Sequence, residues 1–95
     1  MSTATVRFDA PSGRYHLLLG GEVVGLADVV VGEAALRFVH TEVDPRLQGQ
    51  GLAAVLVDGV LDDLAARWPG RPVVPVCSYV VRHFAKRPEL AERMG

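Results

Sequence analysis

A glycine-rich loop in the middle of the chain has the composition of an anion-binding site. The loop follows Pro45 and precedes a long amphipathic segment. Its residues are Gln48, Gly49, Gln50, Gly51, Leu52 and Ala53. A loop that opens a helix carries backbone N–H groups without intrahelical partners, and the helix dipole adds partial positive charge there. Because glycine lets a large anion approach the main chain, the loop predicts a cradle for a diphosphate.

Three further side chains could do chemistry near this loop. His40 and Glu42 stand just before it, and either could deprotonate an amine, directly or through water. Cys77 stands between a predicted strand and a predicted helix, where the helix dipole favours the thiolate. It could accept an acyl group or line a pocket, although a free cysteine is often simply a small buried residue. Strand histidines and carboxylates also often serve as structural hydrogen-bond partners, so all three roles stay open.

The composition limits the class of protein. A chain of 95 residues is enough for one domain with one core, which we expect to span residues 1–95. Its 49% of hydrophobic residues and formal charge of −1 argue against disorder and against nucleic-acid binding. No apolar run approaches the roughly 20 residues that span a membrane, and the N-terminus does not resemble a signal peptide. The single cysteine and the absence of zinc-ligand spacing lead us to expect a cytoplasmic protein without a metal site.

The first half of the chain predicts an antiparallel meander. Four strands are expected, at residues 6–9, 14–19, 22–31 and 35–43. Gly20-Gly21 is typical of a tight hairpin turn, and Gly25 inside the third strand is typical of a bulge. Strict alternation in the fourth strand predicts one face that carries Leu36, Phe38, His40 and Glu42.

The second half changes to a helical period. Residues 51–68 carry an apolar stripe opposite a polar side, and Pro69-Gly70 ends this segment. A short strand at residues 72–76 should run parallel to the strand that ends at Val43, because a helix crosses between them.

A second helix at residues 78–86 completes the predicted architecture, with a last helical turn at residues 89–94. The fold class is α+β: an antiparallel meander leads into a strand–turn–helix–strand crossover, with a mixed central sheet and a C-terminal helix. Ligands of open α/β sheets lie at the carboxyl ends of parallel strands. Residues 43–48 and 77–79 should therefore face one cleft.

Two familiar glycine-rich motifs fit the loop poorly. A Walker loop ends in Gly-Lys-Ser/Thr, which this chain lacks, so P-loop nucleotide triphosphatase chemistry is excluded. Residues 49–54 formally match the dinucleotide-binding pattern with alanine last. That pattern requires a second strand ending in an acidic residue, whereas the next strand here ends at Val76-Cys77.

The spacing Gln48-x-x-Gly51-x-Ala53 resembles the pyrophosphate-binding signature of the GNAT superfamily of acetyltransferases. In that family the motif also lies between a strand and an amphipathic helix, with a parallel strand after it. Three further segments are similar to a small, single-domain GNAT-like subfamily without the N-terminal helices of larger relatives: residues 40–43, 73–77 and 86–89. The resemblance extends over residues 14–90, which is most of the chain.

The resemblance implies a ligand and an activity. Backbone amides of residues 48–53 would hold the diphosphate of acetyl-CoA, and the main chain near Val43 would pair with its pantetheine arm. The protein would move the acetyl group from acetyl-CoA to an amine of a protein lysine, a peptide or a small molecule, with Cys77 near the thioester. The alternative is a non-catalytic acyl-CoA-binding or sensing module. A phosphate-binding or protein-interaction domain without CoA is a third hypothesis.

Two features depart from the family pattern. Many members carry a tyrosine in the second helix that protonates the leaving CoA thiolate, whereas Phe84 stands at about that place here, with Tyr79 and His83 nearby. No basic residue follows the loop directly, since Ala54 and Val55 stand there, so phosphate contacts must depend mainly on the backbone. The candidates for additional phosphate contacts are Arg46, Arg82 and Lys86.

Overall fold

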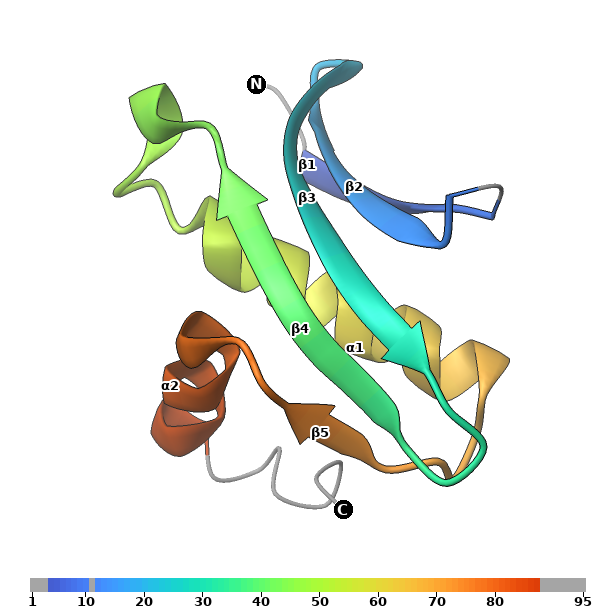
Figure 1. Cartoon of the computed structure of the whole chain (residues 1–95). Coiled ribbons are helices and arrows are strands. Elements are labelled where there is room, and N and C mark those ends of the chain that lie inside the picture. Colours follow the sequence, from blue (N-terminus) through green and yellow to red (C-terminus); the bar gives the residue numbers. More distant parts are fainter. Residues whose placement is uncertain (1–3, 11, 88–95) are drawn as a thin grey trace.

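An antiparallel meander makes up most of a five-stranded sheet (Figure 1). The computed structural model describes residues 4–10 and 12–87 of the chain. Its strands are β1 (Ala4–Asp9), β2 (Arg14–Leu19), β3 (Glu22–Val31), β4 (Leu36–Val43) and β5 (Val73–Pro75). They lie in the order β1-β2-β3-β4-β5; the first three pairs are antiparallel and the β4–β5 pair is parallel. The predicted α+β class with a mixed sheet is confirmed.

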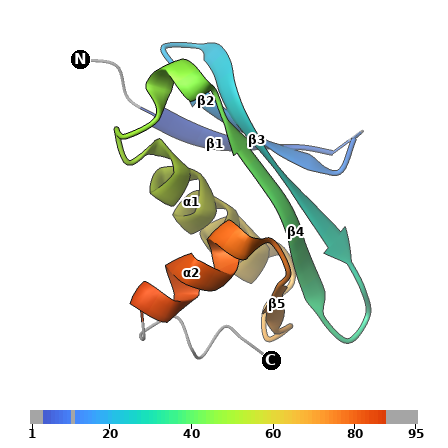
Figure 2. The ribbon, with the colours of Figure 1, turned by 60° about the vertical axis from the view of Figure 1, so that its left-hand side comes forward.

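Two helices lie on the same side of this sheet (Figure 2). Helix α1 (Leu52–Arg67) is the crossover between β4 and β5 and packs against the first four strands, and α2 (Ser78–Lys86) packs against β4 and β5. A short 3-10 turn, η1 (Pro45–Leu47), leads from β4 towards the glycine-rich loop. Both predicted helices are confirmed to within a residue at each end. The helical turn predicted at residues 89–94 lies outside the described residues.

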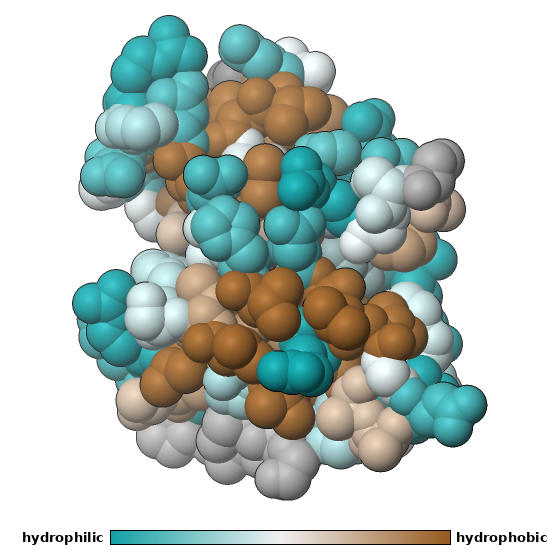
Figure 3. Space-filling model, viewed as in Figure 1, coloured by the Kyte–Doolittle hydropathy of each residue, from teal (hydrophilic) through white to brown (hydrophobic). Residues whose placement is uncertain are grey.

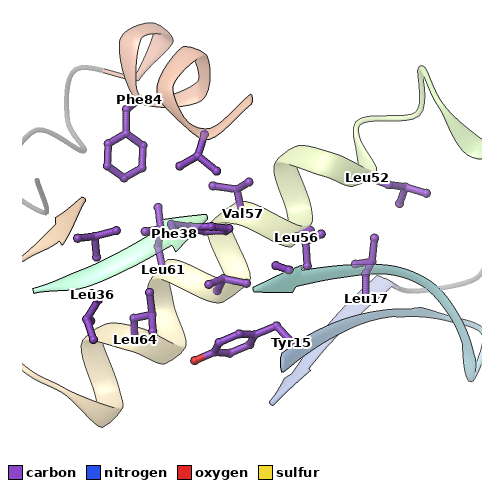
Figure 4. Close-up of a cluster of buried hydrophobic side chains, with 14 of the residues drawn as sticks. Tyr15, Leu17, Leu36, Phe38, Leu52, Leu56, Val57, Leu61, Leu64 and Phe84 are labelled. Carbon is purple, nitrogen blue, oxygen red and sulfur yellow. The ribbon is translucent and has the colours of Figure 1, made fainter. Parts of the chain in front are cut away.

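The apolar stripe of α1 faces the sheet and closes the core. Its fully buried side chains are Leu56, Val57, Val60, Leu61 and Leu64. Figure 4 shows four of them, all except Val60, meeting Leu36 and Phe38 from β4 and Tyr15 and Leu17 from β2, with Phe84 of α2 on the far side. Removing these side chains from water is the main favourable contribution to folding. Strand β4 therefore anchors the core at its first half, where both helices approach it.

Gly59, in the middle of α1, has a packing role that helix propensity does not suggest. Glycine destabilises a helix interior by roughly 1 kcal/mol relative to alanine. A Cβ atom at this position would lie 2.8 Å from Val6 Cβ on β1, which is closer than packed carbon atoms tolerate. The glycine thus lets α1 approach β1 closely.

A β-bulge in β4 reverses the facing of the second half of the strand. The register skips Val39, which has no partner on β3. Before the bulge, Leu36 and Phe38 are fully buried; after it, the side chains of His40 and Glu42 are 50% and 62% exposed. The prediction that these four residues share one face is wrong, because alternation slips by one residue at a bulge.

The bulge also brings two side chains to the inner side of the sheet. Thr41 Oγ1 lies 3.6 Å from Cys77 Sγ at the start of α2, and Val43 packs against the edge of the core. Alternation alone predicts the opposite face for both. The bulge therefore decides which residues of β4 meet the second helix.

A second bulge lies in β3, and the prediction of a bulge near Gly25 is confirmed. The register shifts at Val24, immediately before the glycine. A Cβ atom at Gly25 would lie 2.7 Å from the carbonyl oxygen of Glu42, so the close approach of β3 and β4 requires glycine here. This close approach lies beside the second half of β4.

Strand β5 separates from β4 after a short stretch of pairing. The ladder ends at Phe38↔Pro75, and just beyond it the N–H groups of Val76 and Cys77 both donate to the Phe38 carbonyl, at 2.9 and 3.1 Å. One carbonyl that accepts two consecutive donors ends the regular ladder. The chain then turns into α2, which leaves a gap between the ends of the two parallel strands. Pro75 lies on an edge strand, as expected for a residue without an N–H group.

Candidate active site

The gap between β4 and β5 opens into a cavity of about 410 Å³. Residues predicted to bind the coenzyme line much of it: Val43, Gln48, Gly49, Gly51, Leu52 and Ala53. The remaining lining residues are Thr41, Glu42, Leu47 and Tyr79. Gln50, which was also predicted to bind the coenzyme, does not line the cavity. The end of β4, the loop and the first turn of α2 therefore meet at one cleft, as the topology predicts.

The loop has the backbone geometry of an anion cradle. Gly49 and Gly51 have φ angles of 85° and 74°, a left-handed conformation that favours glycine. Gly51 is the N-cap of α1 and provides no side-chain hydrogen bond, and space is open around both glycines. The first N–H groups of α1, including those of Leu52 and Ala53, thus have no partner within the helix. Together with the helix dipole they favour an anion in the cavity.

The basic side chains around the cleft differ in how strongly they are engaged. Arg46 forms an ion pair with Asp44 at 2.6 Å, and its hydrogen bonds hold the pKa of that carboxyl down at about 2. Arg82 and Lys86 line a second, smaller cavity of about 260 Å³, which shares Tyr79 with the first. These two cations on α2 are thus positioned beside the cleft, whereas Arg46 is already paired.

Cys77 is the N-cap of α2 and lies behind Thr41 rather than on the cavity wall. Burial by itself would raise the pKa of the Cys77 thiol. The Thr41 hydroxyl and the N–H groups of Val80, Tyr79 and Thr41 outweigh burial, so the pKa is lowered from its ordinary value. The site therefore favours the thiolate more than an isolated cysteine would.

His40 and Glu42 form a pair on the outer side of the sheet. His40 Nε2 lies 3.6 Å from Glu42 Oε2. Glu42 lines the cavity at the gap, and it also lines a third cavity of about 600 Å³ on the other side of β4. His40 lines neither cavity and reaches them only through the carboxylate. Of the two predicted candidates for a base, Glu42 is the one that both cavities contact.

Two cavities lie beside the end of β4: the inner cavity, at the β4–β5 gap, and the outer cavity, between β3 and the end of β4. They share part of their walls. Thr41, Glu42, Val43 and Gln48 line both of them. The outer cavity is completed by the bulged part of β3, including Val23 and Leu26. A ligand in one cavity would therefore lie close to a ligand in the other, which is the arrangement that a transfer between two bound molecules requires.

Thr41 is a site residue that the sequence analysis did not assign to the cleft, whereas Tyr79 was expected to face it and lines the cavity. Tyr79 stacks on His83 with ring centroids 6.2 Å apart, and His83 Nε2 lies 3.0 Å from Asp58 Oδ1 on α1. Burial, together with the negative charge of Asp58, raises the pKa of the Tyr79 phenol. Its position just after β5 was a signal for a cleft residue, whereas the facing of Thr41 depends on the bulge.

Within residues 4–10 and 12–87, no group of three or more His, Cys, Asp or Glu side chains is arranged to hold a metal ion. In the same part of the chain, neither helix combines the length and the apolar character needed to cross a membrane.

These features define a class of protein: an α+β domain in which an uncapped helix start faces a gap between two parallel strands. The chain belongs to the GCN5-related N-acetyltransferase family, whose model matches residues 14–93. A comparison with curated proteins gives no match.

Among solved structures, the crystal structure of the ribosomal-protein-S18-alanine N-acetyltransferase from Escherichia coli is similar, with a TM-score of 0.63 and 20% sequence identity. The match covers 77% of this chain and 49% of that one, so the chain spans about half the length of that enzyme. The likeness shows the fold, and the GNAT-like architecture expected from the sequence is confirmed.

Proposed function

We propose that this protein transfers an acetyl group from acetyl-CoA to an amine. The observation that carries the proposal is the cavity at the β4–β5 gap, which opens directly onto the uncapped start of α1. Both glycines of the loop have free space around their Cα atoms, so the residues fit a diphosphate. Acetyl-CoA would supply an activated thioester, and the remaining chemistry depends on residues of this chain.

The coenzyme would be held mainly by the backbone. The N–H groups of Leu52 and Ala53 would donate to the diphosphate, and Arg82 and Lys86 would add positive charge from α2. The second half of β4 has no partner strand on its β5 side, because β5 pairs only as far as Phe38. Its backbone groups beside Val43 are thus available to a pantetheine amide.

Glu42 is the residue that we assign as the base. It lines both cavities, so its carboxylate could accept the proton that an amine in the outer cavity loses as its nitrogen attacks the thioester carbon. As the new C–N bond forms, the C–S bond breaks and the sulfur leaves as a thiolate. Tyr79, on the opposite wall of the inner cavity, is our candidate to donate a proton to that sulfur. His40 would stabilise the carboxylate at 3.6 Å.

Cys77 has a positioning role in this proposal. It lies behind Thr41, outside the lining of the cavity, which favours support of the pocket wall over covalent catalysis. The acetylation state of Cys77, measured on the purified enzyme during turnover, tests this role. An acetyl group found on Cys77 at a rate matching turnover would contradict it and would indicate an acyl-enzyme mechanism.

Calorimetric titration with acetyl-CoA tests the binding part of the proposal. We expect binding by the natural protein and its loss in Gly51→Glu, because the new carboxylate would occupy and repel the diphosphate site. Gly13→Glu is a matched control, since Gly13 also has a left-handed φ of 71° and open space but lies in the β1–β2 turn. No binding by the natural protein, or equal loss in both variants, would contradict a coenzyme site in this loop.

Release of free CoA in the presence of amines tests the chemical part. We expect Glu42→Gln to bind acetyl-CoA normally and to turn over about 100-fold or more slowly, the contribution typical of a general base. Folding is checked by circular dichroism. Binding without turnover of any amine by the natural protein would contradict the enzymatic assignment and support a non-catalytic acyl-CoA-binding module.

A further inference from the structure

The face of the sheet opposite α1 carries an exposed apolar patch. Val30, Arg37 and Val74 are neighbours in register on β3, β4 and β5, and Val76 follows directly after β5. The three valines retain 53%, 37% and 45% of their accessible surface. Figure 3 shows the resulting band of hydrophobic surface where these strands run, and both described helices lie on the other side of the sheet (Figure 2). We call Val30, Val74 and Val76 around Arg37 the valine patch.

Arg37 gives this patch a charge preference. Among the described residues the structure gives no hydrogen bond or ion pair to its guanidinium. A cation that stands between exposed valines favours a partner with an acidic group flanked by apolar side chains. A second copy of the chain is a poor partner, since a two-fold contact centred on the patch would place Arg37 against Arg37.

The same face ends in the outer cavity at Glu42. Arg37 and Glu42 lie five positions apart on β4, about 15 Å at the rise of an extended strand. Between them, Arg14 of β2 pairs with Asp28 of β3 at 2.8 Å, and Asp28 lies opposite His40 of β4 in the sheet. Along β4 the surface therefore runs from a cation among exposed valines, past the polar side chains of His40 and Asp28, to a carboxylate beside the proposed reaction centre.

We propose that this surface is the docking site of a polypeptide acceptor. The amine of the acceptor reaches the outer cavity at Glu42, and an acidic residue of the same polypeptide pairs with Arg37. An extended peptide covers about 15 Å with four to five residues, so the acidic group lies four to five residues from the acetylated one. The inference rests on the proposed function and adds the class of acceptor: a protein or peptide rather than a small polyamine.

The test uses synthetic peptides with one lysine and, five positions away, a glutamate flanked by apolar residues. Against the natural protein, Arg37→Glu is expected to lower kcat/KM for this peptide by about tenfold or more, since like charges are opposed. A peptide with arginine in place of that glutamate should regain activity with Arg37→Glu. Val74→Lys should also lower kcat/KM for the first peptide. Val81→Lys is the matched control, because Val81 is 46% exposed on α2, away from this face.

The readouts separate this inference from the proposed function. Acetyl-CoA binding and acetylation of a small amine should be unchanged in Arg37→Glu, Val74→Lys and Val81→Lys. If the natural protein lacks these basal activities, the proposed function fails, and peptide binding measured by fluorescence anisotropy still tests the docking surface. Equal peptide binding and turnover by the natural protein and Arg37→Glu would overturn it. A dimer in sedimentation that Val74→Lys dissociates would also overturn it, because a second copy would then cover the patch.

Discussion

The two halves of β4 have different surroundings although they belong to one continuous strand. The first half pairs with β3 and β5 on its two sides, and its inward side chains, Leu36 and Phe38, are fully buried. The second half pairs with β3 alone, and its residues Thr41, Glu42 and Val43 line two cavities. A single extra residue, Val39, separates them.

The difference teaches how a small sheet combines a rigid core with an open site. Pairing on both sides and burial under two helices fix the first half. The bulge then rotates the strand, and β5 turns away once the Phe38 carbonyl has accepted two donors. The second half keeps a well-defined backbone because β3 still holds it, yet it leaves one edge free for a ligand.

Removing the anchor of the first half should have the largest effect on stability. Phe38→Ala would leave a cavity under both helices and lower the free energy of unfolding by about 3–5 kcal/mol. Urea denaturation followed by circular dichroism measures this change. Val30→Ala, at a position that is 53% exposed, serves as the control and should change little. A loss below about 1 kcal/mol for Phe38→Ala would contradict the role of the first half as the anchor.

Deleting Val39 should remove the bulge and leave the facing of the second half unchanged. Without the extra residue, Phe38 and His40 become consecutive in a regular ladder opposite Val29 and Asp28, so His40 and Glu42 should stay on the outer face. We therefore expect the free energy of unfolding to change by less than about 1 kcal/mol in urea denaturation. Val39→Thr keeps the residue count and the branched shape, and it serves as the control. A loss above about 3 kcal/mol for the deletion alone would contradict the assignment of Val39 as the extra residue.

Thr41→Val should alter the second half without affecting the core. It removes a hydroxyl that stabilises the thiolate, so the pKa of Cys77 should rise and alkylation at a fixed pH below that pKa should slow. The rate of reaction with iodoacetamide as a function of pH measures this shift. Thr5→Val on β1 is the control for the substitution itself. An unchanged or lowered pKa would contradict the contact between Thr41 and Cys77.

His40→Ala should have the smallest effect on stability. Its ion pair with Glu42 is exposed and at 3.6 Å, so we expect a change within about 0.5 kcal/mol in urea denaturation. Strict alternation would bury His40 beside Phe38 and make the same substitution much more costly. A loss above about 2 kcal/mol would therefore favour the facing that the sequence pattern predicts.

The sequence predicted the elements well because their signals are local. Turn residues and changes of period define β2, β3 and α2, whose observed ends match the predicted ones. The glycine-rich loop was also recognisable, since Gly49 and Gly51 adopt a backbone conformation that favours glycine. Most of the loop residues predicted to hold the coenzyme line the inner cavity, with Gln50 outside it.

The sequence could not predict the facing of His40 and Glu42 or the contribution of Thr41. Val39 is an ordinary strand residue, and it becomes the extra residue only through its pairing with β3. Gly59 is a similar case. Its backbone conformation is that of any helical residue, and glycine is needed there because Val6 of β1 leaves no room for a Cβ atom.

The sequence by itself determined the order and type of the elements, the place of the glycine-rich loop before a helix and the family resemblance, since each depends on neighbours along the chain. Only the tertiary structure decided that β5 leaves β4 after Phe38, that two cavities share the end of β4, and that an unpaired Arg37 stands in an exposed valine patch among the described residues. Those features arise from pairing and packing between segments far apart in the chain, where one extra residue is enough to change which side chain faces the ligand.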